Sequence, residues 1–107
     1  MVKLTKAEAV KMLADVPPDF VFYCRDGKIF KNLKELRDGL ANISDETFLY
    51  HVDESKNDFS RWVRDIIRDD ELADKLSSIS IVSSAADAAA TVGNRVMLLS
   101  RKSRSAK

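Results

Sequence analysis

His51 is the only histidine of this sequence, and histidine is the side chain best suited to act as a general acid or base near neutral pH. Two carboxylates follow it closely, Asp53 after two residues and Asp58 after seven. A carboxylate that orients an imidazole can prepare it to act as a general base, so either aspartate would complete such a pair. No nucleophile accompanies the pair, however, and a base alone is not a catalytic site.

A structural role for His51 is the interpretation that we favour. Its imidazole would hydrogen-bond the polar connector at residues 53–58 and fix the start of the helix that follows. Because no complete catalytic set is visible in the sequence, we expect a non-enzymatic protein. The predicted structural polar cluster comprises Tyr50, His51, Asn57 and Asp58.

No metal and no cofactor are expected. One histidine and one cysteine cannot supply the nitrogen and sulfur ligands that zinc prefers. The acidic run at residues 69–71 lacks the alternating spacing and the glycine of a calcium-binding loop, and it indicates the capped start of a helix instead. The three glycines are scattered, so the sequence contains no glycine-rich phosphate loop.

The composition is that of a soluble globular protein. The 107 residues suit one domain, with 45% hydrophobic and 33% charged residues. The single cysteine, Cys24, excludes an internal disulfide, fits a reducing cytoplasm and lies in an apolar segment where we expect it to be buried. We expect no signal peptide, because the N-terminal segment has no apolar region before Glu8 and Lys11, and the sequence contains no run of about 18 apolar residues. We therefore expect a cytoplasmic protein without a membrane partner.

Charge is distributed unevenly along the chain. Residues 1–94 carry 13 basic and 17 acidic side chains, whereas residues 95–107 carry five basic side chains and no acidic one. A basic tail can contact nucleic acid through phosphate groups, although no aromatic side chain is interleaved with this one to stack on bases. The candidate nucleic-acid-binding residues are Arg101, Lys102, Arg104 and Lys107 in the tail, extended by Arg61, Arg64 and Arg68 on the exposed face of the central helix.

This central helix is the best-specified element, and either Asn57 or Asp58 suits its N-cap position. Counted from Phe59, its apolar residues recur at offsets of three, four, seven and eight, which is the spacing of one face of an α-helix. A tryptophan on such a face contributes mainly by burying area, so we expect it in the core rather than on a ligand. The predicted core anchors are Phe59, Trp62, Val63 and Ile66, followed by Ile67.

A short helix and a β-hairpin are predicted before these elements. Thr5 begins a capping-box pattern, and the two prolines at residues 17–18 end the first helix. The run near residues 20–31 is rich in aromatic and β-branched side chains, which favours a hairpin. Asp26 and Gly27 at its centre favour a type I′ turn.

Two further helices are predicted before the central helix and one after it. Asn32 caps the first, in which Gly39 marks either a close helix–helix approach or a weak point. Ser44 suits the N-cap of the second, over residues 45–52, although strand-like composition leaves a third strand as the alternative. Asp69 caps the third.

A change of composition near residue 78 suggests a compact domain at residues 1–78, a C-terminal alanine-rich helix at 79–100 and the basic tail at 101–107. The apolar residues of this helix are spaced alternately by three and four, as in a heptad seam. We favour packing of the seam on the chain's own domain; the alternative is docking to a protein partner or to a second copy in a homo-oligomer. Gly93-Asn94 could interrupt the helix. The seam residues, which are the candidate partner-binding positions, are Val82, Ala85, Ala89, Val92, Val96 and Leu99.

Several segments follow a recognisable pattern of a hairpin glycine, N-L-x-E-L, Y-H-V, N-D-F-x-x-W and L-A. They are Gly27-Lys28-Ile29, Asn32-Leu33-Lys34-Glu35-Leu36, Phe48-Leu49-Tyr50-His51-Val52, Lys56-Asn57-Asp58-Phe59 with Trp62, and Leu72-Ala73. Over roughly residues 18–77 the chain thereby resembles a small domain family of unknown function that is found mainly in archaea. The resemblance implies an archaeal cytoplasmic protein, and it implies neither a reaction nor a ligand.

The sequence therefore predicts an α+β fold that is predominantly helical, with a small β-hairpin packed against a cluster of short helices. We expect a non-enzymatic protein-interaction module that docks a partner or itself through the C-terminal helix or the face of the central helix. The alternative is an accessory nucleic-acid-binding protein that acts through the basic tail and the arginine face. Apolar docking tolerates salt, whereas phosphate contacts weaken as the ionic strength rises.

Overall fold

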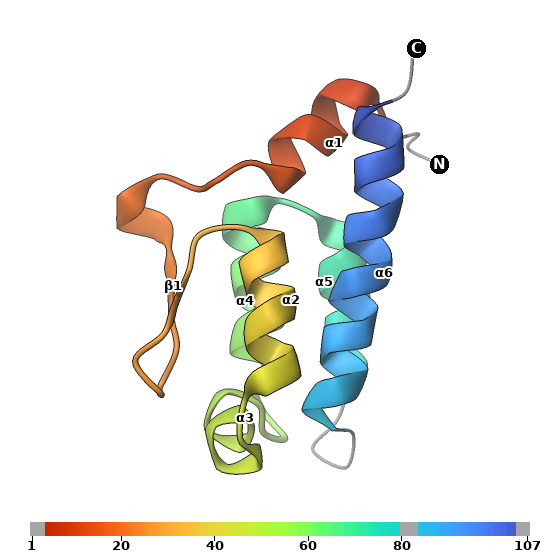
Figure 1. Cartoon of the computed structure of the whole chain (residues 1–107). Helices are drawn as coiled ribbons and strands as arrows, with labels where there is room; N and C mark the ends of the chain where they lie inside the picture. The colour runs from red at the N-terminus through yellow and green to blue at the C-terminus, as the bar shows by residue number, and fades with distance from the viewer. Residues whose placement is uncertain (1–3, 80–83, 105–107) are drawn as a thin grey trace.

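Helices packed around a small hairpin make up the fold, as Figure 1 shows for the computed structural model, which describes residues 4–79 and 84–104. The predicted α+β, predominantly helical class is confirmed. The longest helix, α6, runs along one side of the molecule beside α2 and α5 (Figure 1). In chain order the elements are α1 Lys6–Leu13, η1 Pro18–Phe20, β1 Phe22–Tyr23, β2 Ile29–Phe30, α2 Leu33–Asn42, α3 Asp45–His51, α4 Asp58–Trp62, η2 Val63–Ile67, α5 Asp70–Ser77 and α6 Ala85–Ser103.

The capping box predicted for α1 is present. The Thr5 hydroxyl accepts from the backbone N–H of Glu8 at 3.1 Å, and the Glu8 carboxylate accepts from the backbone N–H of Thr5 at 2.9 Å. Both bonds satisfy N–H groups that a helix start leaves without intrahelical partners. Ala9 is buried in the core, whereas Val10 is half exposed.

The hairpin pairs Phe22 with Phe30 and Tyr23 with Ile29 in an antiparallel register. Successive side chains of a strand point to opposite faces, so the two phenylalanines are buried and Tyr23 and Ile29 face outward. Two strands alone are marginally stable in water. Packing of the inner face on the helices therefore holds this hairpin in place.

The turn of the hairpin differs from the type I′ turn that the sequence predicted. A type I′ turn needs a positive φ at both central residues, and Gly27 has one (φ 93°) while Asp26 does not. The backbone N–H of Gly27 donates to the carbonyl of Cys24 at 3.0 Å, and the N–H of Cys24 donates to the carbonyl of Lys28 at 2.9 Å. The loop therefore has three residues, with the glycine in the position that requires a positive φ.

A close approach at Gly39 joins α2 to the hairpin. Asn32 caps α2, its side-chain oxygen accepting from the backbone N–H of Glu35 at 2.8 Å. A methyl group at Gly39 would collide with the ring of Phe30. The close approach that the sequence suggested is thus between a helix and a strand rather than between two helices.

Residues 45–51 form helix α3, so the helix predicted there is confirmed and the third-strand alternative is wrong. The Ser44 hydroxyl accepts from the backbone N–H of Thr47 at 3.1 Å and caps the helix. Local capping outweighs the strand-like composition because β propensity depends strongly on context. After α3 the chain turns, and Val52 forms a single antiparallel bridge with Asn57.

Helix α4 continues directly into the π-helical turn η2. Asn57 is the N-cap of α4, its side-chain oxygen accepting from the backbone N–H of Ser60 at 3.0 Å. Arg68 ends the segment in a left-handed conformation (φ 68°), and its N–H donates to the carbonyl of Val63 at 2.8 Å, the i to i+5 bond of a π-helix. The side chains of Phe59, Trp62 and Val63 are buried and that of Ile66 is partly buried.

Helix α6 shares the core of the helices before it. It packs on α1 and α2, and its inner side chains are buried with theirs in one hydrophobic cluster. Residue 78 therefore does not separate two cores, and the helix extends through Gly93 to Ser103, into the segment that the sequence assigned to the tail. Within residues 4–79 and 84–104, no helix is long and apolar enough to cross a membrane.

Candidate functional site

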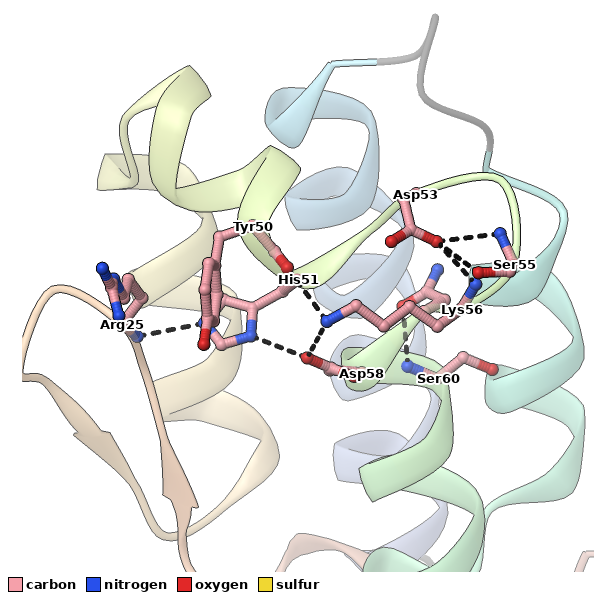
Figure 2. A network of polar contacts seen from close by, with 9 residues as sticks. Arg25, Tyr50, His51, Asp53, Ser55, Lys56, Asp58 and Ser60 are labelled. Carbon is pink, nitrogen blue, oxygen red and sulfur yellow. Dashed lines mark hydrogen bonds and ion pairs between the residues drawn. The ribbon is translucent and has the colours of Figure 1, made fainter.

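His51 is held by hydrogen bonds to two other elements, the loop of the hairpin 26 residues before it and the start of α4 seven residues after it (Figure 2). Its Nε2 accepts from the backbone N–H of Arg25 at 3.0 Å, and its Nδ1 lies 3.0 Å from Oδ2 of Asp58. Because Nε2 accepts a hydrogen bond, the neutral ring carries its proton on Nδ1 and donates it to the carboxylate. The side chain is 5% exposed, so one buried imidazole links the hairpin, α3 and α4.

Lys56 reinforces the contact between His51 and Asp58. Its ammonium group donates to the carbonyl of Tyr50 at 3.0 Å and to Oδ2 of Asp58 at 3.1 Å (Figure 2). The guanidinium of Arg25 and the ammonium of Lys56 both lie over the ring of Tyr50, 4.7 and 5.2 Å from its centroid. Cation–π contacts at exposed sites contribute about 0.5–1 kcal/mol, so these contacts are a modest reinforcement.

Asp53, the other carboxylate considered as a partner of His51, forms its hydrogen bonds within the connector at residues 53–58 instead. Its Oδ1 accepts from the backbone N–H and the hydroxyl of Ser55 and from the backbone N–H of Lys56, at 2.8, 3.0 and 2.9 Å. These bonds, that from the Ser55 N–H above all, hold the pKa of the Asp53 carboxyl below its ordinary value. The side chain thus closes a tight turn of the kind that aspartate favours.

Asn57 and Ser60 connect the same region to α5. The side-chain amide of Asn57 donates to the carbonyl of Leu76 at 2.9 Å, and the buried hydroxyl of Ser60 donates to the carbonyl of Ala73 at 2.7 Å. Members of the predicted polar cluster therefore meet in space, and Ser60 joins them. No sequence signal identifies Ser60 as a member of this cluster, because its role depends on a helix that begins ten residues later.

The chemistry open to His51 in this geometry is limited. Both ring nitrogens are engaged, and the rings of Phe22 and Phe59 lie with their centroids 5.2 Å from its own. No imidazole lone pair faces solvent, so the ring orders three elements and is not placed to take a proton from a substrate. In the part of the chain that the structure describes, no three His, Cys, Asp or Glu side chains gather as a metal site would require.

A buried ion pair that the sequence did not predict lies on the other side of the core. The guanidinium of Arg95 donates to both carboxylate oxygens of Asp69, at 2.7 and 3.0 Å, and to Glu71 at 3.0 Å. Asp69 also accepts from the backbone N–H of Leu72 at 3.1 Å as the cap of α5. The side chains of Arg95 and Asp69 are 7% and 1% exposed, so this pair fixes α6 on the start of α5.

The predicted arginine face is interleaved with acidic side chains. Arg61 lies 4.0 Å from Asp65, and Arg64 lies 2.7 Å from Asp74 and 3.7 Å from Asp70. The hydrogen bond to Asp74 is the main reason that the pKa of Arg64 is raised. Arg68 is the left-handed residue that ends η2, Arg101 and Lys102 belong to the last turn of α6, Arg104 is its C-cap, and Lys107 lies outside the described residues.

The two sides of α6 have different surroundings. Of the predicted partner-binding seam, Ala85, Val92, Val96 and Leu99 are buried in the chain's own core, Ala89 is partly buried, and Val82 lies outside the described residues. The seam is therefore covered by α1 and α2 and is not a free surface. The opposite side, which we call the outer face of α6, consists of Ala86, Asp87, Ala90, Thr91, Asn94, Met97, Leu98 and Arg101.

Comparison with known families gives a match to a family of unknown function (DUF5752) over residues 20–90, more than half of the chain. The chain belongs to this family. The match starts at the last residue of η1, just before the hairpin, and ends inside α6, beyond the limit near residue 77 that the sequence segments suggested. It assigns no activity and no ligand. Neither a curated protein nor a solved structure matches the chain.

Proposed function

We propose that this chain is a non-enzymatic protein-interaction module that docks its partner through the outer face of α6. The observation that carries the proposal is the absence of charge from the middle of this face. Between Asp87 and Arg101 the only charged residue is Arg95, which is buried in the ion pair with Asp69. One third of all residues are charged, so a charge-free helical face about 20 Å long is unusual for this chain.

Exposed apolar side chains support the same proposal. Met97 and Leu98 are adjacent on the outer face, with 56% and 46% of their surfaces exposed. Scattered apolar residues are normal on a protein surface, whereas two large ones on an uncharged helical face resemble an interface. The core of a protein–protein interface is typically depleted in charge and enriched in methionine and aromatic side chains. The outer face has the first property and contains Met97.

A matched pair of variants tests this proposal. Leu98→Lys places a charge on the outer face, and Leu49→Lys places the same charge on α3, where the leucine is 48% exposed. We expect a protein captured from the native lysate by the tagged wild type and by Leu49→Lys to be lost with Leu98→Lys, in low and high salt. Capture that is equal for all three proteins would contradict a role for the outer face.

The alternative function, nucleic-acid binding through the basic tail, is tested in the same experiment. Arg101, Lys102 and Arg104 support it, but the acidic neighbours of Arg61 and Arg64 weaken the contribution of the arginine face. Binding through phosphate contacts would disappear on nuclease treatment or in high salt and would survive Leu98→Lys. That outcome would replace the first proposal by the second.

The setting that we propose is a reducing cytoplasm. Cys24 is buried as a free thiol, and burial raises the pKa of this thiol above its ordinary value. A protonated, inaccessible thiol is unreactive, which suits a structural position rather than a redox one.

A further inference from the structure

We propose that the partner of the outer face is a second copy of this chain, and that the two α6 helices pair antiparallel about a two-fold axis at Asn94. This inference rests on the proposed function, because it names the partner of the same face. Asn94 is exposed and lies at the centre of the charge-free stretch. Asp87 and Arg101 lie at its two ends, seven residues before and seven residues after Asn94.

Charge complementarity between the two ends of the face argues for this partner. In an antiparallel pair centred on Asn94, residues whose numbers are equally distant from 94 lie at the same level along the two helices. Asp87 of one copy then faces Arg101 of the other, and the symmetry makes the same contact twice. Both side chains belong to exposed residues, so each can reach across the interface.

A parallel pair would have the opposite effect. It would place Asp87 beside its own symmetry mate and Arg101 beside its own, and like charges at a contact oppose association. The charge pattern of the face therefore selects the antiparallel arrangement.

The sizes of the side chains between the charged ends also match. Ala90 lies at the level of the second copy's Leu98, and Thr91 lies at the level of its Met97. Each large exposed side chain of one helix thus meets a small one of the other, as in the packing of knobs into holes. Because the charge-free stretch contains no competing ion, this contact buries no unpaired charge.

A hollow beside α6 can receive one of these side chains. It has a volume of about 210 Å³, opens between α5 and α6, and is lined by Lys75, Thr91, Asn94, Arg95 and Leu98. In the antiparallel pair the second copy's Leu98, at the level of Ala90, lies one residue or about 1.5 Å along the helix from Thr91, which lines this hollow. Helix α5 flanks this side of the outer face through Lys75, whereas α1 and α2 pack on the inner side of α6.

Sedimentation of the purified full chain gives the first test. We expect a species of twice the 12.0 kDa chain mass that dissociates on dilution. Leu98→Lys should be monomeric at concentrations where Leu49→Lys remains dimeric, with circular dichroism spectra that show both variants folded. A wild type that stays monomeric across the concentration range, or a Leu98→Lys variant that stays dimeric, would overturn the inference.

Exchange of charges tests the antiparallel register itself. Asp87→Lys and Arg101→Glu each place like charges at both ends of the interface, so each variant alone should be monomeric. Mixed in equal amounts they should form a heterodimer, because lysine at 87 then faces glutamate at 101 and Arg101 faces Asp87. Failure of the mixture to associate, while each variant remains folded, would overturn the antiparallel pairing. Asp87 also forms a capping box with Ser84, and Asp87→Lys removes this cap as well as changing the charge. The double variant Asp87→Lys/Arg101→Glu provides a second comparison, because it lacks the same cap but has opposite charges at both ends of the interface. It should therefore be dimeric, whereas Arg101→Glu alone should be monomeric.

The two proposals fail in different ways. A monomeric wild type that captures another protein through the outer face, with capture lost in Leu98→Lys, would overturn the two-fold pairing and leave the proposed function standing. If Leu98→Lys captures the same protein from the lysate as the wild type does, the proposed function is contradicted, whatever the oligomeric state of the purified chain.

Discussion

The backbone N–H of Arg25 donates to Nε2 of His51 at 3.0 Å, across 26 residues of sequence. Through this bond the loop of the hairpin is attached to α3, and through Nδ1 the same ring is attached to Asp58 at the start of α4. The imidazole supplies the acceptor for this N–H group of the hairpin loop. A partly buried N–H group that loses its partner costs free energy, so we expect the ring to contribute to stability.

Replacement of His51 by alanine should destabilise the fold by about 1–3 kcal/mol, the usual cost of leaving a buried polar group unpaired. It leaves the N–H of Arg25 without its acceptor and opens a gap beside Phe22 and Phe59. Urea unfolding followed by circular dichroism measures the loss. Glu54→Ala, an exposed change in the adjacent connector, should have little effect, and a His51→Ala protein as stable as the wild type would contradict the structural role.

The tautomer of His51 can be observed directly. Because Nε2 accepts from Arg25, the neutral ring should carry its proton on Nδ1. Nitrogen chemical shifts of the imidazole distinguish a protonated from an unprotonated ring nitrogen, so an NMR spectrum at neutral pH identifies the tautomer. A ring protonated on Nε2 instead would be incompatible with the hydrogen bond to the hairpin.

The pair of Arg95 and Asp69 should be among the most sensitive positions of the chain. Arg95→Met removes the guanidinium and leaves the Asp69 carboxylate buried, and the loss of one partner of a buried ion pair typically costs about 3–5 kcal/mol. Adding Asp69→Asn, which removes the unpaired charge, should recover part of this loss. Arg61→Met, at an exposed pair 4.0 Å from Asp65, is the control and should cost less than about 1 kcal/mol. Equal losses for Arg95→Met and Arg61→Met in urea unfolding would show that burial of the pair is unimportant.

Replacement of Gly39 and of Gly93 by alanine should change the free energy of unfolding in opposite directions. Gly39→Ala places a methyl group in the ring of Phe30 and should destabilise the fold by about 1–3 kcal/mol, as overpacking does. At Gly93 the added methyl group meets only the side chain of Arg37, at 3.4 Å, so the better helix propensity of alanine should stabilise the fold by about 0.5–1 kcal/mol. Thermal unfolding of the two variants compares them, and a stabilising Gly39→Ala would be inconsistent with the contact between α2 and the hairpin.

Alkaline pH should reveal the burial of Cys24. Burial raises the pKa of this thiol above its ordinary value in the folded chain, so the unfolded chain loses its proton first as the pH rises. The contribution of Cys24 to stability is therefore complete below about pH 9 and decreases above it, with a slope of at most about 1.4 kcal/mol per pH unit. The free energy of unfolding of wild type minus that of Cys24→Ala, measured from pH 7 to 10, isolates this effect. A difference that does not fall with rising pH would contradict a buried thiol.

Local signals in the sequence account for much of the fold. The caps at Thr5, Asn32, Ser44 and Asn57 act within three residues of themselves, so each could be recognised from its neighbours and each marks a helix start. The hairpin is predicted in the same way, but the predicted type of its turn is wrong. The φ angle of Asp26 depends on the length of the loop, and Asp-Gly fits both two-residue and three-residue loops.

Contacts between distant residues could not be predicted in this way. Arg95 meets Asp69 across 26 residues, and the only signal was a charged residue in the middle of an otherwise apolar stretch of helix. No side-chain cap marks the π-helical turn that ends at Arg68, and this turn lies against α5. The heptad spacing of α6 located its inner face but not what covers it, because a seam of this kind packs equally well on its own domain and on a partner.

The most direct test of the account is photo-crosslinking from position 94, the centre of the outer face of α6. A photoreactive amino acid placed there, and another placed at residue 54 in the exposed connector, are irradiated in the native lysate and in the purified protein. We predict protein adducts from position 94 and none from position 54, with an adduct of twice the chain mass in the purified protein if the partner is a second copy. The absence of any protein adduct from position 94 in both settings would contradict the claim that this face binds a protein.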